Sequence, residues 1–485
     1  MNNKYFLSTQ TSNELLKILA LGSKRNFEKK FKKNTKLKIL KLKKIPNLKI
    51  LFFFLNTIIN AFFFKKKLLG LKYKNIHLSI YVLAQTFQDY RSYTSKFIFY
   101  KNLFKNIYFA ARILNFANSS LKNIVAAYID HGTYLNGILF QCLAQRKIII
   151  YSNSMPRGLF KIDFNKIKKK TLFNDFLKFS HSYNISKSQI KKSKIILKKI
   201  IYKNQIIPWI KKIKYTKDYH YDYSKVSHVV YAHSFTDAQF HFGNDGFLNT
   251  KEWLYFTISK LLENNNKNKI LLKAHPNYFT KFMGERAPWD KKIFELFKKE
   301  LPDDDNLIII NKPIKNLELL KKLENNTILI SHHSTAVLEG IYFGFKCISS
   351  DKTWWDCSKL KLSNSWSNKD NYNALLKKKW INLNYANKKD FYSVIKDYLF
   401  NPYHYGGKKH FFNIIINKLK IKDIKLRYGD EKQKKIVMNR LATIKMNRAV
   451  SKKEEIESGK IKKMNLDMRM KIIKEISENI ENIFL

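Results

Sequence analysis

Short apolar runs alternate with longer stretches of helical composition through most of residues 74–350. The apolar runs are rich in isoleucine, valine and leucine, as in strands that are buried on both faces of a parallel sheet. The alternation predicts an α/β fold. The predicted strands are residues 76–84, 121–129, 147–151, 227–231, 269–273, 306–310, 328–330 and 345–350, and the predicted helices are residues 97–117, 134–146, 250–262, 289–300, 317–323 and 335–343.

The stretch 327–350 is the most complete unit of this pattern. Apolar β-branched residues are followed by the polar turn 331–334, a short helix, and Gly344, a residue favoured just past a helix end. The turn is expected to place hydroxyl and free backbone N–H groups at the helix N-terminus, where the helix dipole attracts phosphate. Alternatively, Ser334 serves only as a helix cap.

The alternation occurs in two runs, which predict two Rossmann-like domains that face each other. Residues 71–217 form the first, with a basic helical connection over residues 158–217, and residues 218–400 form the second. Residues 1–70 are expected to form a basic and apolar helical arm. Residues 401–485 are expected to form a basic helical tail, because isoleucines recur at helical spacing near its end.

Lysine and arginine outnumber aspartate and glutamate by 93 to 37, so the formal net charge is +56. Such a charge favours a negatively charged partner: an anionic membrane surface, an acidic glycan, a nucleotide or a nucleic acid. Lysine, asparagine, isoleucine, phenylalanine and tyrosine are abundant together, which also fits an AT-rich coding bias. The charge by itself therefore does not indicate nucleic-acid binding.

The cellular setting is predicted from the cysteines and from the most apolar stretch. Three cysteines without metal-ligand spacing fit a reducing cytosol, and the N-terminus lacks the pattern of a signal peptide. Residues 50–64 are shorter than the roughly 20 residues of a spanning helix, and lysines flank them. A buried helix, a membrane-surface helix and a span are the alternatives. We expect a cytoplasmic protein with peripheral contact at the inner membrane face.

The loops that follow the predicted strands hold the candidate binding residues, since ligands of parallel α/β sheets collect at the carboxyl ends of strands. His275 can donate to a phosphate oxygen, and Lys273 adds a positive charge. A carboxylate at Glu339 can accept hydrogen bonds from a ribose diol. Alternatively, His275 only ends a strand and Glu339 faces solvent. The predicted donor-nucleotide and phosphate site comprises Lys273, His275, Ser331, Ser334, Thr335 and Glu339, beside a cleft loop with His233, Ser234 and Asp237.

Two motifs of this chain resemble the paired signature of bacterial capsule polysaccharide glycosyltransferases. They are Lys-Ala-His-Pro at residues 273–276 and SHHSTAVLEG at residues 331–340, and residues 231–238 also resemble the opening of that family's second domain. The family is similar to Kdo transferases and, more remotely, to HP-motif sialyltransferases. The resemblance covers residues 120–360.

The resemblance implies a GT-B-like fold, in which two Rossmann-like domains face a cleft and the second domain holds the donor. It places His275, Ser334 and Thr335 at the donor phosphate and Glu339 at the ribose. The pair His332-His333 departs from the family pattern, because small residues are commoner in that turn.

A sugar transferase also needs a group that removes a proton from the acceptor hydroxyl. Asp130 and His131 follow a predicted strand of the first domain, and imidazole transfers protons readily near neutral pH. The alternative is that Asp130 caps the next helix and His131 packs. The acidic run at residues 303–305 is expected to form a solvated turn, so we predict no required metal and no cofactor.

These features together predict a glycosyltransferase that builds a capsule or lipopolysaccharide glycan. The donor would be a nucleotide-activated sugar, for example a CMP-linked one, and the acceptor an anionic or lipid-linked glycan, with no specific nucleic acid as a partner. A polyol-phosphate transferase of teichoic-acid type is a neighbouring alternative, although residues 331–334 differ from that family's Asp-Tyr-Ser-Ser pattern. A basic nucleic-acid-binding protein is the alternative from another class.

Overall fold

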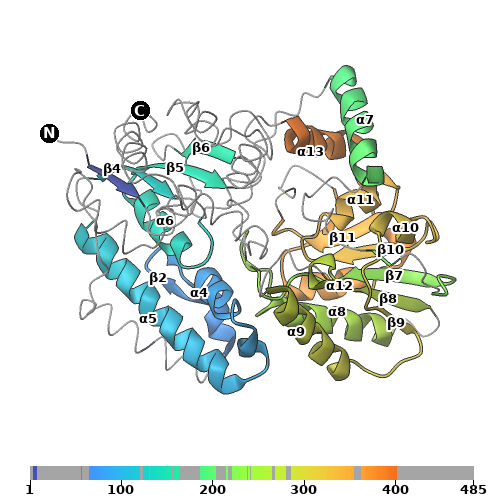
Figure 1. Ribbon diagram of the computed structural model, residues 1–485, viewed down its shortest axis with the longest axis horizontal. Coiled ribbons are helices and arrows are strands. Elements are labelled where there is room, and N and C mark those ends of the chain that lie inside the picture. The colour runs from blue at the N-terminus through green and yellow to red at the C-terminus, as the bar shows by residue number, and fades with distance from the viewer. Residues whose placement is uncertain are drawn as a thin grey trace, which may run out of the picture.

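In its described part, the computed structural model contains two larger β-sheets with their helices (Figure 1) and one two-stranded sheet. It describes residues 4–7, 56, 65–120, 124–129, 132–154, 158–162, 186–203, 215–216, 221–237, 239–240, 242–264, 268–279, 286–353, 355 and 362–400.

The larger sheet consists of six parallel strands in the order β12-β11-β10-β7-β8-β9. The chain runs outward from β7 to β9, returns to the other side of β7, and continues from β10 to β12. This is a doubly wound topology, and its order reverses between β7 and β10. The strands are β7 (Val226–Tyr231), β8 (Lys269–Lys273), β9 (Leu307–Ile310), β10 (Ile328–Ser331), β11 (Lys346–Ser350) and β12 (Asn364–Trp366).

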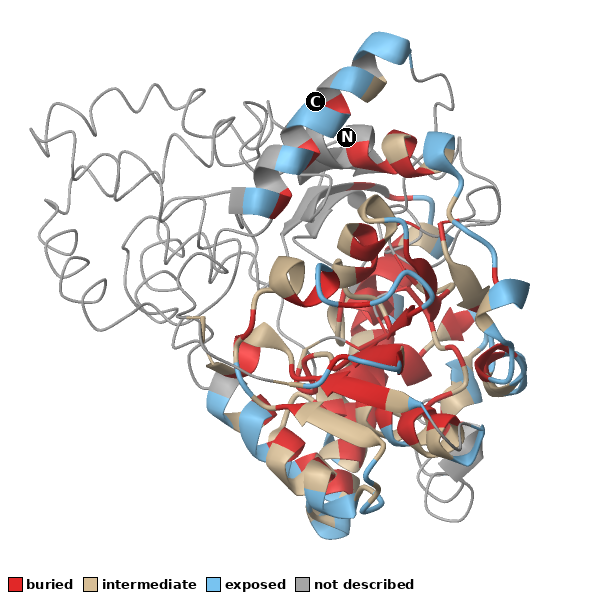
Figure 2. Cartoon of the chain, turned by 90° about the vertical axis from the view of Figure 1, so that its right-hand side faces the viewer, coloured by how far each residue is buried: buried red, intermediate tan, exposed pale blue. Residues whose placement is uncertain are grey.

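Helices cover both faces of the larger sheet. Successive strand residues point to opposite sides, so the burial of neighbouring residues reports on the two faces separately. Val229 and Leu329 belong to one apolar cluster, whereas their neighbours Val230 and Ile330 belong to another, so both faces are buried (Figure 2). The cluster with Val230 includes residues of α8 (Thr250–Asn264), α9 (Arg286–Glu300) and α12 (Lys369–Leu376), and the cluster with Val229 includes residues of α10 (Asn316–Leu320) and α11 (Ala336–Tyr342).

Two further helices pack together on the α11 side of the larger sheet. They are α7 (Lys187–Lys203) and α13 (Lys388–Phe400), and both contribute to the apolar cluster that contains Val229. Leu197 and Ile201 of α7 are buried there. The basic segment before the second run of strands therefore shares the core of the larger sheet.

The smaller sheet has the order β1-β4-β5-β6, in which β1, β4 and β5 are parallel and β6 is antiparallel. Its core residues come mainly from three helices. The elements are β1 (Lys4–Leu7), β4 (Ile124–Ile129), β5 (Ile149–Ser154), β6 (Gly158–Ile162), α4 (Ser79–Thr86), α5 (Lys96–Ser120) and α6 (Asn136–Gln145).

The strand predicted over residues 76–84 is wrong. Only β3 (Ile76–His77) is a strand there, paired with β2 (Lys72–Tyr73), and the remainder belongs to helix α4. Every residue from 79 to 84 is buried. A segment buried on all sides shows no amphipathic period, so a short apolar run cannot be assigned to strand or helix from periodicity alone.

Two other expectations near the smaller sheet need correction. Strand β1 lies in residues 1–70, which were expected to be helical, and it completes the sheet by pairing with β4. Strand β6 lies in residues 158–217, which were also expected to be helical. Both are edge strands: β1 pairs with a strand more than 100 positions away, whereas β6 forms an antiparallel hairpin with β5, the strand just before it. Residues 401–485 and all of residues 50–64 except Asn56 lie outside the described residues.

The other predicted elements that fall on described residues are confirmed, with ends that differ by a few positions. Gly344 follows helix α11 with φ +86°, the left-handed conformation that favours glycine. The α/β fold class, with a parallel sheet, is therefore confirmed. No described helix combines the length and the hydrophobicity that a membrane crossing requires.

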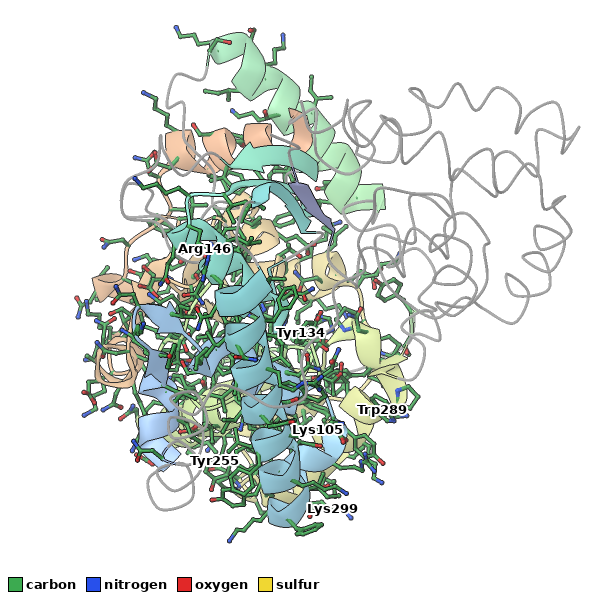
Figure 3. All side chains as sticks on the ribbon, turned by 90° about the vertical axis from the view of Figure 1, so that its left-hand side faces the viewer. Lys105, Tyr134, Arg146, Tyr255, Trp289 and Lys299 are labelled. Atoms are coloured by element: carbon green, nitrogen blue, oxygen red, sulfur yellow. The ribbon has the colours of Figure 1, made fainter. Side chains whose placement is uncertain are left out.

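The parts built on the two sheets meet through aromatic side chains of the short helix η2 (Tyr90–Tyr93). The ring of Tyr90 stacks on that of Trp289 of α9, with centroids 5.3 Å apart. The Tyr93 hydroxyl donates to the Phe235 carbonyl over 2.6 Å. Figure 3 labels Trp289 and also Tyr134, a second residue at this junction.

Candidate functional site

A cavity of about 220 Å³ opens at the carboxyl ends of β7, β8 and β10, where the strand order reverses. This is the position at which open α/β sheets bind ligands. The cavity is lined by Ile201, Tyr215, Tyr231, Ala232, His233, Ser234, Asp237, Lys273, Ala274, His275, Pro276, Asn277, Ile314, Asn316, His333, Ser334, Thr335, Ala336 and Glu339.

The structure brings most of the predicted site residues together in this cavity. Those that line it are Lys273, His275, Ser334, Thr335, Glu339, His233, Ser234 and Asp237. Ser331 does not line it: this side chain is fully buried, and its Oγ accepts a hydrogen bond from the Ser334 N–H over 3.0 Å. Asp130 and His131, the predicted catalytic pair, lie outside the described residues.

Lys273 is a buried cation on the cavity wall. It ends strand β8, is 5% exposed, and forms neither an ion pair nor a side-chain hydrogen bond with any described residue. Burial lowers the pKa of Lys273 to about 8, and the negative charge of Glu339 opposes that shift. The side chain is therefore mostly charged at neutral pH and lacks a close counter-ion.

Glu339 lies on the same cavity, on helix α11. Its Oε2 accepts a hydrogen bond of 2.6 Å from the side-chain amide of Asn316. Burial raises the pKa of Glu339, whereas the Asn316 hydrogen bond and the Lys273 charge act in the opposite direction. Glu339 is half-buried and faces the cavity.

His275 is held as a neutral imidazole. Its Nδ1 accepts the Asn277 backbone N–H over 3.2 Å, so the proton of the neutral ring is on Nε2. Burial lowers the pKa of His275 to about 3, with a further decrease from Lys273 and an opposing effect of Asp237. His275 is thus a fixed hydrogen-bond donor and not a source of protons near neutral pH.

The turn before α11 differs from the expectation of free N–H groups. The Ser334 N–H is bonded to Ser331, the Ala336 N–H is bonded to the Ser334 Oγ over 3.2 Å, and the Val337 N–H is bonded to the Ser334 carbonyl. Helix α11 has only seven residues. The polar groups that this turn can offer a ligand are therefore the hydroxyls of Ser334 and Thr335 rather than a row of free N–H groups on a long helix.

The loop after β7 is held in place by Asp290 of α9. The Ser234 hydroxyl donates to Asp290 Oδ2 over 2.5 Å, and the Thr236 N–H and hydroxyl both donate to Oδ1 over 2.9 Å. Burial raises the pKa of Asp290 to about 6, although these three hydrogen bonds act to lower it. Asp290 fixes one rim of the cavity without lining it.

Asp237 connects this rim to the smaller sheet. The Tyr134 hydroxyl lies 3.5 Å from Asp237 Oδ1. Tyr134 follows strand β4 and has φ +52°, a conformation that is strained for a residue with a large side chain. The loop after β4 is the one in which Asp130 and His131 were expected to act, and Tyr134 is its described contact with the cavity rim.

Sequence reasoning missed several residues that build the site. Asp290 lay inside a predicted helix, and nothing in its local sequence distinguishes it from a surface residue. Tyr215 and Asn316 line the cavity but carry no motif. Among the described residues, no three or more His, Cys, Asp or Glu side chains gather as a metal site requires.

No protein-family model matches the sequence, and a search of curated proteins found no match. Among solved structures, the beta Kdo 2,4 transferase KpsC of Thermosulfurimonas dismutans matches 56% of this chain and 80% of its own, with 11% identity and a TM-score of 0.36. The UDP-GlcNAc 2-epimerase of Methanocaldococcus jannaschii, in complex with UDP-GlcNAc and UDP, matches 60% of this chain and 80% of its own, with 15% identity and a TM-score of 0.27. At such TM-scores the residues of the cavity, and not these similarities, must carry any functional conclusion.

Proposed function

We propose that the chain is a glycosyltransferase that moves a sugar from a nucleotide-activated donor to a glycan acceptor. The observation that carries the proposal is Lys273, a buried ammonium on the cavity wall with no ion-pair partner among the described residues. A buried charge is costly unless an opposite charge neutralises it. The phosphate of a sugar nucleotide supplies that charge.

The remaining polar groups of the cavity fit the other parts of such a donor. His275 offers one fixed N–H, and the hydroxyls of Ser334 and Thr335 offer further donors to phosphate oxygens. Asn316 orients Glu339 through Oε2, which leaves the other lone pairs of the carboxylate for the two hydroxyls of a ribose. The cavity thus pairs a phosphate-binding wall with a diol-binding group.

The acceptor and the donor nucleotide follow from the motif resemblance and the charge. The resemblance supports a capsule or lipopolysaccharide glycan as the acceptor and a CMP-linked sugar as one donor to test. The net charge of +56 favours an anionic acceptor and contact with an anionic membrane face. Asp130 and His131 remain the proposed acceptor-side groups.

A thermal-shift panel with CMP, CDP, UDP and GDP tests the proposal. We expect at least one nucleotide to stabilise the protein, by about 2.7 kcal/mol at a hundred times its Kd. Lys273→Met should abolish this stabilisation, because the phosphate loses its counter-charge. Lys269→Met is the matched control, since Lys269 begins the same strand and pairs with Asp222 away from the cavity.

Two outcomes would contradict the proposal. Stabilisation by CDP-glycerol alone, with no response to sugar nucleotides, would favour the polyol-phosphate transferase. No response to any nucleotide, together with tight salt-dependent RNA affinity that Lys273→Met leaves unchanged, would favour a nucleic-acid-binding protein.

A further inference from the structure

A basic segment with exposed apolar side chains joins α12 to α13 and includes the first two residues of α13. Residues 377–389 contain five lysines and no acidic residue. All five lysines are exposed, and so are Ile381 and Tyr385, at 69% and 56%. We call these exposed residues the lysine patch: Lys377, Lys378, Lys379, Ile381, Tyr385, Lys388 and Lys389.

The backbone of the lysine patch is fixed by two side chains of the larger sheet. Lys346, which begins β11 and is 3% exposed, donates through Nζ to the Trp380 carbonyl over 3.0 Å. Asn364, which begins β12, donates to the Asn384 carbonyl over 3.0 Å and accepts the Asn384 N–H over 2.9 Å. These contacts precede and follow Ile381 in the chain, so the sheet sets its position.

The segment separates its apolar side chains into buried and exposed ones. Leu383 is 3% exposed and belongs to an apolar cluster of the larger sheet, and Trp380 packs against that cluster. Ile381 and Tyr385 remain in water. A single exposed apolar side chain is common in globular proteins and indicates no partner by itself. The lysines on both sides of these two residues are therefore what points to a partner.

The composition of the lysine patch fits the face of an anionic bilayer. Lysines are attracted to negatively charged headgroups, and each contributes about fivefold to the affinity. A tyrosine ring favours the interface between water and lipid, and an isoleucine side chain gains by entering the acyl boundary. Stable membrane attachment takes two such signals, and the patch combines positive charge with apolar area.

A nucleic acid would use the same lysines but would leave Ile381 in water. Its bases would also need free aromatic faces on which to stack. Lys346 Nζ lies 3.8 Å from the centroid of the Trp380 ring and 4.7 Å from that of the Tyr385 ring, so a buried cation occupies one face of each ring. A bilayer, in contrast, removes the Ile381 side chain from water. The lysine patch therefore favours a membrane over a nucleic acid.

The lysine patch and the cavity lie at opposite edges of the larger sheet. Lys346 and Asn364 are the first residues of β11 and β12, so the patch lies at the amino ends of these strands. The cavity opens at the carboxyl ends of β7, β8 and β10, and all of these strands are parallel. Binding through the patch would leave the cavity accessible to a soluble nucleotide.

We propose that the lysine patch binds the face of an anionic lipid bilayer. Ile381 enters the boundary between headgroups and acyl chains, the Tyr385 ring lies among the headgroups, and the five lysines contact the lipid charges. This inference rests on the membrane contact included in the proposed function and is independent of the sugar transfer.

Co-sedimentation of the full chain with lipid vesicles tests the charged part of the patch. We expect binding to vesicles of equal parts phosphatidylglycerol and phosphatidylcholine, and binding about tenfold weaker or more to phosphatidylcholine alone. Lys377→Gln, Lys378→Gln and Lys379→Gln combined should weaken binding to the mixed vesicles by about 100-fold. Raising the salt from about 0.1 M to about 1 M should weaken wild-type binding, because the Debye length shortens from about 10 Å to about 3 Å.

Ile381→Ser tests the apolar part of the patch. The variant should weaken binding to the mixed vesicles about tenfold at both salt concentrations, because salt does not screen the burial of an aliphatic side chain. Its thermal unfolding should match that of the wild-type protein, since Ile381 is exposed.

Helix α5 offers matched controls for both parts. Phe97 is 75% exposed, and Lys96, Lys101 and Lys105 are exposed on the same helix (Figure 3 labels Lys105). Phe97→Ser removes an exposed apolar side chain, and the change of these three lysines to glutamine removes the same charge as the patch triple variant. Both controls should leave vesicle binding nearly unchanged.

Three results would overturn the inference. They are no binding of the wild-type protein to the mixed vesicles, equal losses in the α5 and patch variants, and unchanged binding in Ile381→Ser. RNA affinity that falls in the lysine triple variant, without vesicle binding by the wild-type protein, would assign the patch to a nucleic acid instead.

The sugar-transfer proposal fails separately. Vesicle binding through the patch in a protein that no nucleotide stabilises would refute the sugar transfer and keep the membrane surface. Nucleotide stabilisation that depends on Lys273, in a protein that binds no vesicles, would refute the membrane surface and leave the nucleotide site intact.

Discussion

The two sheets differ in the direction of their strands and in whether a cavity opens at their strand ends. All six strands of the larger sheet are parallel, and buried helices cover both of its faces. The smaller sheet ends in the antiparallel strand β6. The order of the larger sheet reverses between β7 and β10, so neighbouring loops separate there and leave the cavity.

The larger sheet and its helices supply the residues that line the cavity, whereas the smaller sheet contacts only its rim. Lys273, His275, Ser334 and Glu339 all come from the larger sheet and its helices. The smaller sheet reaches the rim of the cavity through Tyr134, and η2 supports the loop that carries the rim. Four sets of variants test how separate these two parts are, beginning with the largest expected effect.

Replacing a large core side chain in each part tests whether they unfold together. Trp253→Ala in α8 and Phe140→Ala in α6 each remove a fully buried aromatic ring and should cost about 3–5 kcal/mol of unfolding free energy. If the parts unfold independently, each variant lowers only one of two calorimetric transitions. One shared transition that both variants lower equally would show that the parts are a single cooperative unit.

The pH dependence of stability should report on Asp290, the residue that holds the β7 loop. Its pKa of about 6 in the folded chain lies above the usual value of 3.8. Its contribution is therefore full below about pH 4 and is lost as pH rises through 6, with a total on the order of 3 kcal/mol. Urea unfolding from pH 4 to 7 measures this slope.

Asp290→Asn should remove this part of the pH dependence, because the amide does not titrate. A wild-type slope that persists in Asp290→Asn would assign the effect to other groups.

Two helical glycines allow a matched comparison of packing in the two parts. A Cβ on Gly137 of α6 would meet the Tyr81 ring at 1.9 Å, and one on Gly340 of α11 would meet the Leu329 Cδ1 at 2.2 Å. A leucine methyl group can rotate away, whereas the buried ring cannot. Gly137→Ala should therefore cost about 1–3 kcal/mol and Gly340→Ala less, as measured by urea unfolding. The reverse order would show that the helices of the smaller sheet repack more readily.

The smallest effect is expected at the contact between Tyr134 and Asp237. Tyr134→Phe removes one long hydrogen bond of 3.5 Å and should change the unfolding free energy by less than about 0.5 kcal/mol. The informative measurement on Tyr134→Phe is its affinity for the nucleotide that the thermal-shift panel selects. Unchanged nucleotide affinity would indicate that the smaller sheet does not influence the proposed nucleotide cavity, and a several-fold change would show that it does.

Strands β7 to β11 of the larger sheet were predictable because each lies in a short apolar run between polar turns, whereas β12 was missed because its sequence, Asn-Ser-Trp, is not such a run. Their loops were predictable as site loops because parallel strands end at one edge, which is how His275 and Ser334 could be placed together. Segment 76–84 was not predictable, since full burial of α4 removed the period that identifies a helix. Strand β1 was missed because its pairing partner β4 is distant in sequence, and β6 was missed because the basic composition of residues 158–217 favoured helix.

Within the site, motifs identified the residues that line the cavity but not those that hold them. Asp290 acts through Ser234 and Thr236, which lie more than 50 positions away, so no local pattern reveals it. Asp245 stood in a polar loop, yet its bond to His332 depends on how β7 and β10 pair. The tautomer of His275 follows only from a hydrogen bond formed in the folded chain.

The burial of Lys273 links ligand binding to proton exchange with the buffer. Its amine has a pKa of about 8, and a phosphate bound beside it would raise that pKa. Near pH 9 each nucleotide that binds should therefore draw a fraction of a proton from solution. The apparent heat of binding should then depend on the ionisation heat of the buffer, an effect that fades near pH 6.5 and disappears in Lys273→Met.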